Sequence, residues 1–121
     1  MVKKISPLAP KSFPKIPNIK GVEIGTARSG VKYKGRNDIF TAIFDKGTSV
    51  AGVFTQSRVP AEPVTFCKKN IVDGKARALI VNAGFANAYT GAKGKKINKS
   101  ISSNVKKTLK CNEKDIFICS T

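Results

Sequence analysis

The apolar positions of this chain follow two periods, and together they predict a fold that mixes strands and helices. Strands are expected where apolar residues alternate or run together, and helices where they recur every third or fourth position. The order strands, helix, strand, helix, strand indicates a mixed, largely antiparallel sheet with covering helices, an α/β fold of the α+β kind. The predicted strands cover residues 21–31, 38–45, 50–55, 76–81 and 116–119, and the predicted helices cover 61–70 and 91–110.

Several of these elements carry more specific expectations. The strand 38–45 is apolar on both faces, which is typical of a central strand. The strand 50–55 follows a short turn and is expected to form a hairpin with it, and Gly25 is expected to break the first strand. Thr90 is the expected N-cap of the second helix. One apolar stripe of that helix is expected to be buried, and it comprises Ile97, Ile101, Val105 and Leu109.

The chain divides into an extended leader and one domain. Residues 1–19 are rich in Pro and Lys, and proline favours extended backbone while donating no hydrogen bond to a sheet. Residues 20–121 form the predicted domain. With 121 residues, 40% hydrophobic and 7% aromatic, the chain supports one modest core. Composition alone is compatible with a self-sufficient small domain.

The charge is strongly basic, with 23 Lys and Arg against 7 Asp and Glu. A basic excess of this size is a signal for nucleic acid or another anionic surface. Arginine, however, occurs only at four positions, and lysine is the less specific partner of phosphates and bases. A lysine-rich solvated surface is therefore the favoured interpretation. No stretch has the length of a signal peptide core or a membrane span, so a cytoplasmic protein without a membrane partner is expected.

Candidate catalytic groups are sparse. There is no histidine, and the three cysteines Cys67, Cys111 and Cys119 form no Cys-x-x-Cys pair. These facts exclude the usual zinc spacings, and the odd number of cysteines argues against a disulfide framework. The cysteines are expected to be reduced and buried, with no metal site. The carboxylates, Asp38 among them, fall at turns and strand ends, where solvated charges are typical. No self-contained catalytic set is predicted.

The loop after the strand 76–81 is the most distinctive stretch. Its small residues allow close approach of the backbone, and Asn82 and Asn87 offer both donors and acceptors. Spacing alone favours a tight connection in which the asparagines stabilise local turns. A binding role is the second interpretation.

Sequence motifs favour the second interpretation. Residues 81–91 read V-N-A-G-F-A-N-A-Y-T-G and resemble the segment V-N-S-G-N-A-N-A-x-T-G of the ornithine acetyltransferase (glutamate N-acetyltransferase) family. Residues 52–55 match its G-V-F-T, residues 61–64 its A-x-P-V, and residues 119–121 resemble the start of its S-T-G-V-I-G. The resemblance extends from about Lys20 onward. Three positions depart from the family pattern, namely Ser57, Ala83 and Phe85.

The resemblance implies an enzyme of arginine biosynthesis. Members of that family transfer an acetyl group from N-acetylornithine to glutamate through an acyl-enzyme on a Thr nucleophile, and acetyl-CoA is an additional co-substrate of some; no other cofactor is implied. Their precursor cleaves itself into two chains that form an α2β2 assembly with an αββα sandwich like that of N-terminal-nucleophile hydrolases. By this resemblance residues 20–121 are an incomplete N-terminal part of the acetyltransferase domain, from the α chain. The nucleophile lies outside these residues, so the segment alone is expected to be inactive.

The resemblance also assigns roles to individual residues. Thr121 matches the Thr of the family's Thr-Gly pair, which stabilises the oxyanion of the tetrahedral intermediate. Asn82, Gly84 and Asn87 are expected to bind substrate or to support that site. Two alternatives stay open: a small lysine-rich nucleic-acid-binding domain that uses the helix 91–110, and a truncated product without function.

Overall fold

The structure, a computed structural model, describes residues 6–121, so the first five residues of the predicted leader lie outside the described part. Residues 6–20 contain no helix or strand, in agreement with the expectation for the leader. The division into leader and domain stays a prediction. The elements are β1 (Val22–Ala27), β2 (Ile39–Phe44), α1 (Glu62–Asn70), β3 (Ala78–Asn82), α2 (Gly91–Leu109) and β4 (Ile116–Ser120), with short 3₁₀ turns at Ile71–Asp73 and Glu113–Asp115.

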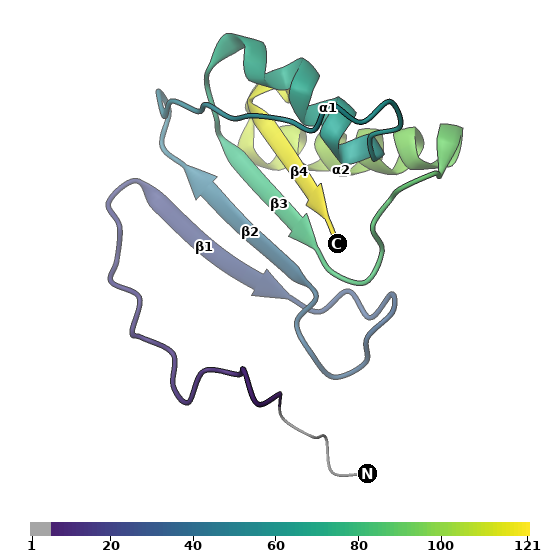
Figure 1. The fold of residues 1–121 in the computed structure, drawn as a ribbon. Coiled ribbons are helices and arrows are strands. Elements are labelled where there is room, and N and C mark those ends of the chain that lie inside the picture. The colour runs from purple at the N-terminus through teal and green to yellow at the C-terminus, as the bar shows by residue number, and fades with distance from the viewer. Residues whose placement is uncertain (1–5) are drawn as a thin grey trace.

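The four strands form one sheet in the order β1-β2-β3-β4 (Figure 1). β1 and β2 are antiparallel, as are β2 and β3, whereas β3 and β4 run parallel. The register places Ala42 opposite Leu79, and Leu79 opposite Phe117. The parallel pair requires a crossover, and α2 provides it. The predicted mixed, largely antiparallel sheet with covering helices is therefore confirmed.

Strand β4 is buried because α1 covers its free edge. Ile116, Phe117 and Ile118 are all buried. The N–H of Ile118 donates to Sγ of Cys67 at 3.3 Å, and Nδ2 of Asn70 donates to the carbonyl oxygen of Ile116 at 2.8 Å. An open strand edge presents unpaired backbone groups, and here two side chains of one helix satisfy them.

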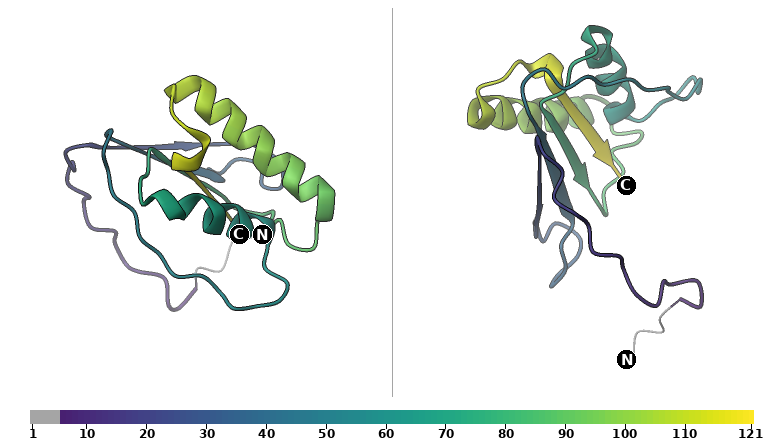
Figure 2. Two further views of the ribbon diagram at one scale, coloured as in Figure 1. Left: turned by 90° about the horizontal axis from the view of Figure 1, so that it is seen from above. Right: turned by 90° about the vertical axis from the view of Figure 1, so that its left-hand side faces the viewer.

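The core lies on the side of the sheet where these elements meet. Cys67, Ala76 and Phe117 form its buried cluster, and the partly buried residues around it are Phe44, Val50, Phe54, Phe66, Ile71 and Leu79. Figures 1 and 2 show both helices near β4, with β1 at the opposite edge. Ile24 of β1 is accordingly 53% exposed. β2 is central, as predicted, although only Ala42 in it is fully buried.

Two strand predictions were wrong. Residues 50–55 do not form a strand, because β1 and β3 occupy both edges of β2 and leave no place for a hairpin partner. The segment 45–61 instead contains no helix or strand. It is held by an isolated bridge between Ser49 and Lys75, where the N–H of Val50 donates to the carbonyl oxygen of Gly74. Gly25 does not break β1, which is continuous through it.

The burial of α2 also differs from the prediction. Its four stripe residues are only half-buried, whereas the buried positions are Gly94, Asn98 and Ser102. The helix begins after Thr90, as expected, but the Thr90 side chain makes no capping bond. The hydroxyl donates instead to Oδ1 of Asn87 at 2.6 Å.

The cysteines are free, but they differ in exposure. Cys67 is buried, Cys111 is half-buried and Cys119 is exposed, so the expectation that all three are buried was wrong. Desolvation raises the pKa of the Cys67 thiol above its usual range. Among the helices of residues 6–121, none combines the length and apolar character needed to span a membrane.

Candidate functional site

The candidate site lies where β3 and β4 end. Because the two strands run parallel, their carboxyl ends meet at one end of the sheet. The N–H of Thr121 donates to the carbonyl oxygen of Asn82 at 3.0 Å, and the N–H of Gly84 donates to that of Thr121 at 2.5 Å. The structure therefore brings together three of the four residues predicted from the sequence, Asn82, Gly84 and Thr121.

Both polar atoms of the Asn82 side chain help to hold this end together. Its Oδ1 accepts a hydrogen bond from the Ser120 hydroxyl at 2.6 Å, and its Nδ2 donates to the carbonyl oxygen of Phe85 at 3.0 Å. The second of these bonds stabilises the turn, as the spacing favoured, while the first crosses to β4. Ser120 was missed as a site residue, although it lies inside the motif that identified Thr121.

Gly84 is in a position where a side chain does not fit. Its φ is +98°, which is favourable only for glycine, and a Cβ there would lie 2.7 Å from Cε2 of Tyr33. The Tyr33 ring is in turn covered by the guanidinium of Arg36, 3.8 Å from the ring centroid. The segment before β2 thus packs directly on the loop that holds Thr121.

The buried Asp38 side chain holds the segment before β2 through hydrogen bonds. It is only 4% exposed, and its two carboxylate oxygens accept hydrogen bonds from the Ser29 N–H at 2.5 Å and the Ser29 hydroxyl at 2.6 Å. These bonds, the side-chain one first, hold the pKa of Asp38 below its usual value. The expectation of a solvated carboxylate was wrong here. The Asp38 carbonyl oxygen also accepts from the N–H of Ala83, which ties it to the same loop.

Asn87 lies apart from the residues around Thr121. It is 2% exposed, has φ of +52°, and donates from Nδ2 to Oδ1 of Asn98 at 3.0 Å and to the carbonyl oxygen of Gly94 at 3.3 Å. Its own carbonyl oxygen accepts from the N–H of Glu62 at 3.2 Å. Asn87 therefore anchors the far end of the loop to α2 and to the start of α1.

A cavity of about 350 Å³ opens beside Asn82 and Ser120. Its walls are mostly apolar, and Lys93 is its one charged lining residue in the part of the chain that is described. Such a cavity suits a small molecule with an aliphatic portion, oriented by a few polar groups. The lining residues are Ser29, Val31, Ile39, Asn82, Ala83, Phe85, Lys93, Ile97, Ile101 and Ser120. Over residues 6–121 no three carboxylate or thiol side chains gather in a way that would hold a metal ion.

Comparison with known proteins gives a consistent result. The model of the ArgJ family matches residues 23–121. The arginine biosynthesis bifunctional protein ArgJ of Mesorhizobium japonicum is 50% identical over 117 residues, which are 97% of this chain and 28% of that protein. The protein of the same name from Brucella suis is 49% identical over 121 residues, all of this chain and 29% of that protein. The chain thus spans less than a third of the length of these relatives.

Solved structures agree with the sequence comparison. The crystal structure of the arginine biosynthesis bifunctional protein ArgJ from Bacillus halodurans superposes with a TM-score of 0.78 at 32% identity, covering 84% of this chain and 53% of that one. Ornithine acetyltransferase from Mycobacterium tuberculosis, solved in complex with ornithine, gives 0.73 at 27% identity, covering 84% and 56%. By sequence and by fold, this chain belongs to the ArgJ family.

Proposed function

We propose that this chain is the N-terminal part of an enzyme that transfers an acetyl group from N-acetylornithine to glutamate in arginine biosynthesis. The observation that carries the proposal is the position of Thr121, whose main chain is hydrogen-bonded on both sides to Asn82 and Gly84. Thr121 is exposed in this chain. The comparisons do not favour the alternative of a nucleic-acid-binding domain.

In the proposed reaction Thr121 stabilises charge and does not form the covalent bond. A Thr nucleophile outside these 121 residues attacks the acetyl carbonyl of N-acetylornithine, with its own amine as base. The carbonyl oxygen becomes an oxyanion, to which the Thr121 hydroxyl donates a hydrogen bond. Ornithine leaves as the amine, and the glutamate amine then attacks the acyl-enzyme and takes the acetyl group.

The Asn82–Gly84 loop supports this role by keeping Thr121 in place before substrate arrives. A donor that is already oriented loses little free energy to reorganisation in the transition state. Asn82 fixes Ser120, the residue directly before Thr121, while Gly84 binds the Thr121 carbonyl. Asn87 acts indirectly, because it holds the end of the loop that leads into α2.

Three further parts of the proposal concern the whole protein. The remainder of the precursor packs against the part of the sheet that is exposed in this chain, and it supplies the nucleophile. The two chains form an α2β2 assembly. Relatives are named bifunctional, which favours acetyl-CoA as an additional acetyl donor. We also propose the cytoplasm as the location of the protein.

The test is an acetyl-transfer assay with N-acetylornithine and glutamate on the full-length protein. Thr121→Ala is expected to lower kcat by about 10² to 10³, as for loss of one oxyanion donor, with a smaller change in KM. Thr121→Ser keeps the hydroxyl and is expected to retain most of the activity. Thr108→Ala is the matched control, because Thr108 is exposed and bonds only within α2.

Two results would contradict the proposal. If Thr121→Ala left kcat unchanged, the hydroxyl would not stabilise the oxyanion. If the isolated chain of 121 residues turned over N-acetylornithine, the nucleophile would lie within it.

A further inference from the structure

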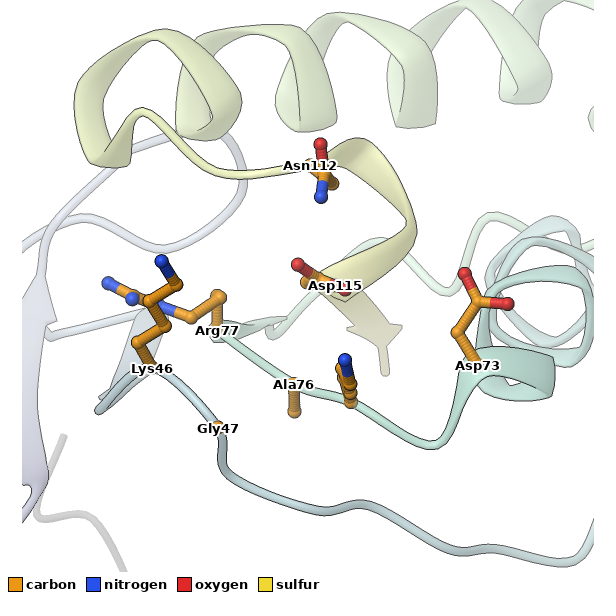
Figure 3. A pocket seen from close by; sticks show the side chains of 8 residues that line it. Lys46, Gly47, Asp73, Ala76, Arg77, Asn112 and Asp115 are labelled. Atoms are coloured by element: carbon orange, nitrogen blue, oxygen red, sulfur yellow. The ribbon is translucent and has the colours of Figure 1, made fainter.

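A second pocket lies at the other end of the sheet, away from Thr121 (Figure 3). Arg77 directly precedes β3 and Asp115 directly precedes β4, so the pocket is at the amino ends of the two parallel strands. The length of β3 separates it from Asn82. Its volume is about 520 Å³, and its lining comprises Lys46, Gly47, Asp73, Lys75, Ala76, Arg77, Asn112 and Asp115.

The charges in this pocket are not balanced by internal ion pairs. Three cationic side chains, Lys46, Lys75 and Arg77, face two carboxylates. Asp73 is already paired with Lys114 at 3.3 Å, outside the lining. Among residues 6–121 no carboxylate oxygen lies within 4.0 Å of a side-chain nitrogen of the three cations. Figure 3 shows the ends of Lys46 and Arg77 on the same side of the pocket.

The main chain of Arg77 is held by two hydrogen bonds, whereas its side chain has a nitrogen without a hydrogen-bond partner. Its N–H donates to the carbonyl oxygen of Asp115 at 2.7 Å, and its carbonyl oxygen accepts from the N–H of Phe44 at 2.9 Å. Its Nε is buried and has no hydrogen-bond partner in the described part of the chain. A buried donor without an acceptor is costly, and the cost is greater when the donor is charged.

We propose that this pocket binds a small oxyanion, a carboxylate or a phosphate, between Arg77 and Lys46. Guanidinium and ammonium groups are the donors that such anions prefer, and charge-assisted bonds of this kind are the stronger ones. The anion accepts hydrogen bonds from the terminal NH2 groups of the Arg77 guanidinium and from the Lys46 ammonium, and so relieves the repulsion between the two cations. The Asn112 amide, which also lines the pocket, is a neutral donor. The negative charge of Asp115 lowers the net positive charge of the pocket. The pocket therefore favours a small anion over a polyanion. The site is separate from the one proposed for acetyl transfer.

The direct test is a titration of the ¹⁵N-labelled chain with inorganic phosphate, with KCl adjusted to keep ionic strength constant. The Nε–H resonance of Arg77 is expected to shift to a plateau, while amides near Thr121 stay unchanged. Parallel titrations with acetate and with citrate distinguish a carboxylate site from a phosphate site. A linear, unsaturated response to every anion, or the same response to KCl alone, would overturn the proposal.

Variants separate binding in the pocket from general attraction to a basic protein. Lys46→Met and Arg77→Lys are each expected to weaken phosphate binding about tenfold, as for loss of one hydrogen bond to a charged group. Lys68→Met removes one exposed charge on α1 and is expected to leave the affinity nearly unchanged. Equal losses in all three variants would contradict a built site. Calorimetric titration of the full-length protein with phosphate repeats this comparison without relying on the fold of the isolated chain.

Discussion

The two ends of the β3–β4 pair differ in how their polar groups are satisfied. At the carboxyl ends, the Asn82 amide, the Ser120 hydroxyl and the main chain of Thr121 are bonded to one another. At the amino ends, Lys46 and Arg77 are charged and make no ion pair within the described residues.

This difference indicates that the two ends of the sheet are suited to different roles. Where hydrogen bonds are completed internally, the backbone is held in one geometry, which is what a preorganised donor requires. Where charged donors make no ion pair within the described residues, they are available to an anion from outside. The first end is thus suited to positioning a residue, and the second to receiving a ligand.

The largest expected effect concerns Gly84, at the internally satisfied end. Gly84→Ala is expected to lower the free energy of unfolding by about 2 to 4 kcal/mol, because the new Cβ adopts a left-handed conformation and also collides with Tyr33. Urea denaturation of the chain measures it.

Gly35→Ala is the matched control for this prediction. Gly35 also has positive φ, at +78°, but nothing lies within 4 Å of the added Cβ. Only the backbone cost of about 1 to 2 kcal/mol is expected there. Equal losses in the two variants would show that Tyr33 does not press on the loop.

The next effect is the pH dependence of the contact between Asp38 and Ser29. The pKa of Asp38 is lowered in the folded state, so its ionised form stabilises the fold above the ordinary value of 3.8. That contribution is lost as the pH falls through the lower pKa of the folded protein. Asp38→Asn is therefore expected to be less stable than wild type at neutral pH, and the difference should narrow below pH 3.8.

Denaturation midpoints measured across this pH range check the prediction. Asp45→Asn serves as the control, because Asp45 is exposed. A difference between wild type and Asp38→Asn that stayed constant with pH would mean that the lost contact is not ionic in origin.

Hydrophobic patterns predicted most elements of the fold and failed where pairing is decided at a distance. β2, β3, β4 and both helices have strong periodicity, and all five form. The segment 50–55 has the composition of a strand, but both edges of β2 are already occupied. A local hydrophobic pattern does not show whether a neighbouring strand has a free edge.

The buried face of α2 was missed for a related reason. Asn98 and Ser102 are buried because each has a polar partner 11 residues away, Asn87 for one and Glu113 for the other. Burial of such residues depends on hydrogen-bonding partners, which hydropathy does not encode.

In the candidate site, too, the local motif predicted residues correctly, whereas contacts from distant segments were missed. The motif around residues 81–91 and the final Thr identified Asn82, Gly84 and Thr121, which the structure brings together. Asp38 and Tyr33 support them from another segment. Nothing in their local sequence reveals that they contact the loop, because Asp38 contacts it through its carbonyl oxygen, which accepts from the N–H of Ala83, and Tyr33 through its ring beside Gly84.

The smallest expected effect lies at the charged end and tests its lack of internal pairing. Lys46→Met removes one of two neighbouring unpaired cations, so at low ionic strength it is expected to raise the free energy of unfolding by a few tenths of a kcal/mol, about the size of an exposed charge interaction. The gain should fade as KCl screens the repulsion. It should reverse in phosphate, because an anion held by Lys46 and Arg77 stabilises the folded wild type and not the variant. Thermal denaturation in KCl and in phosphate of equal ionic strength measures both effects. If Lys46→Met were destabilising in KCl as well, Lys46 would already have a partner within the protein, and the contrast between the two ends of the sheet would not hold.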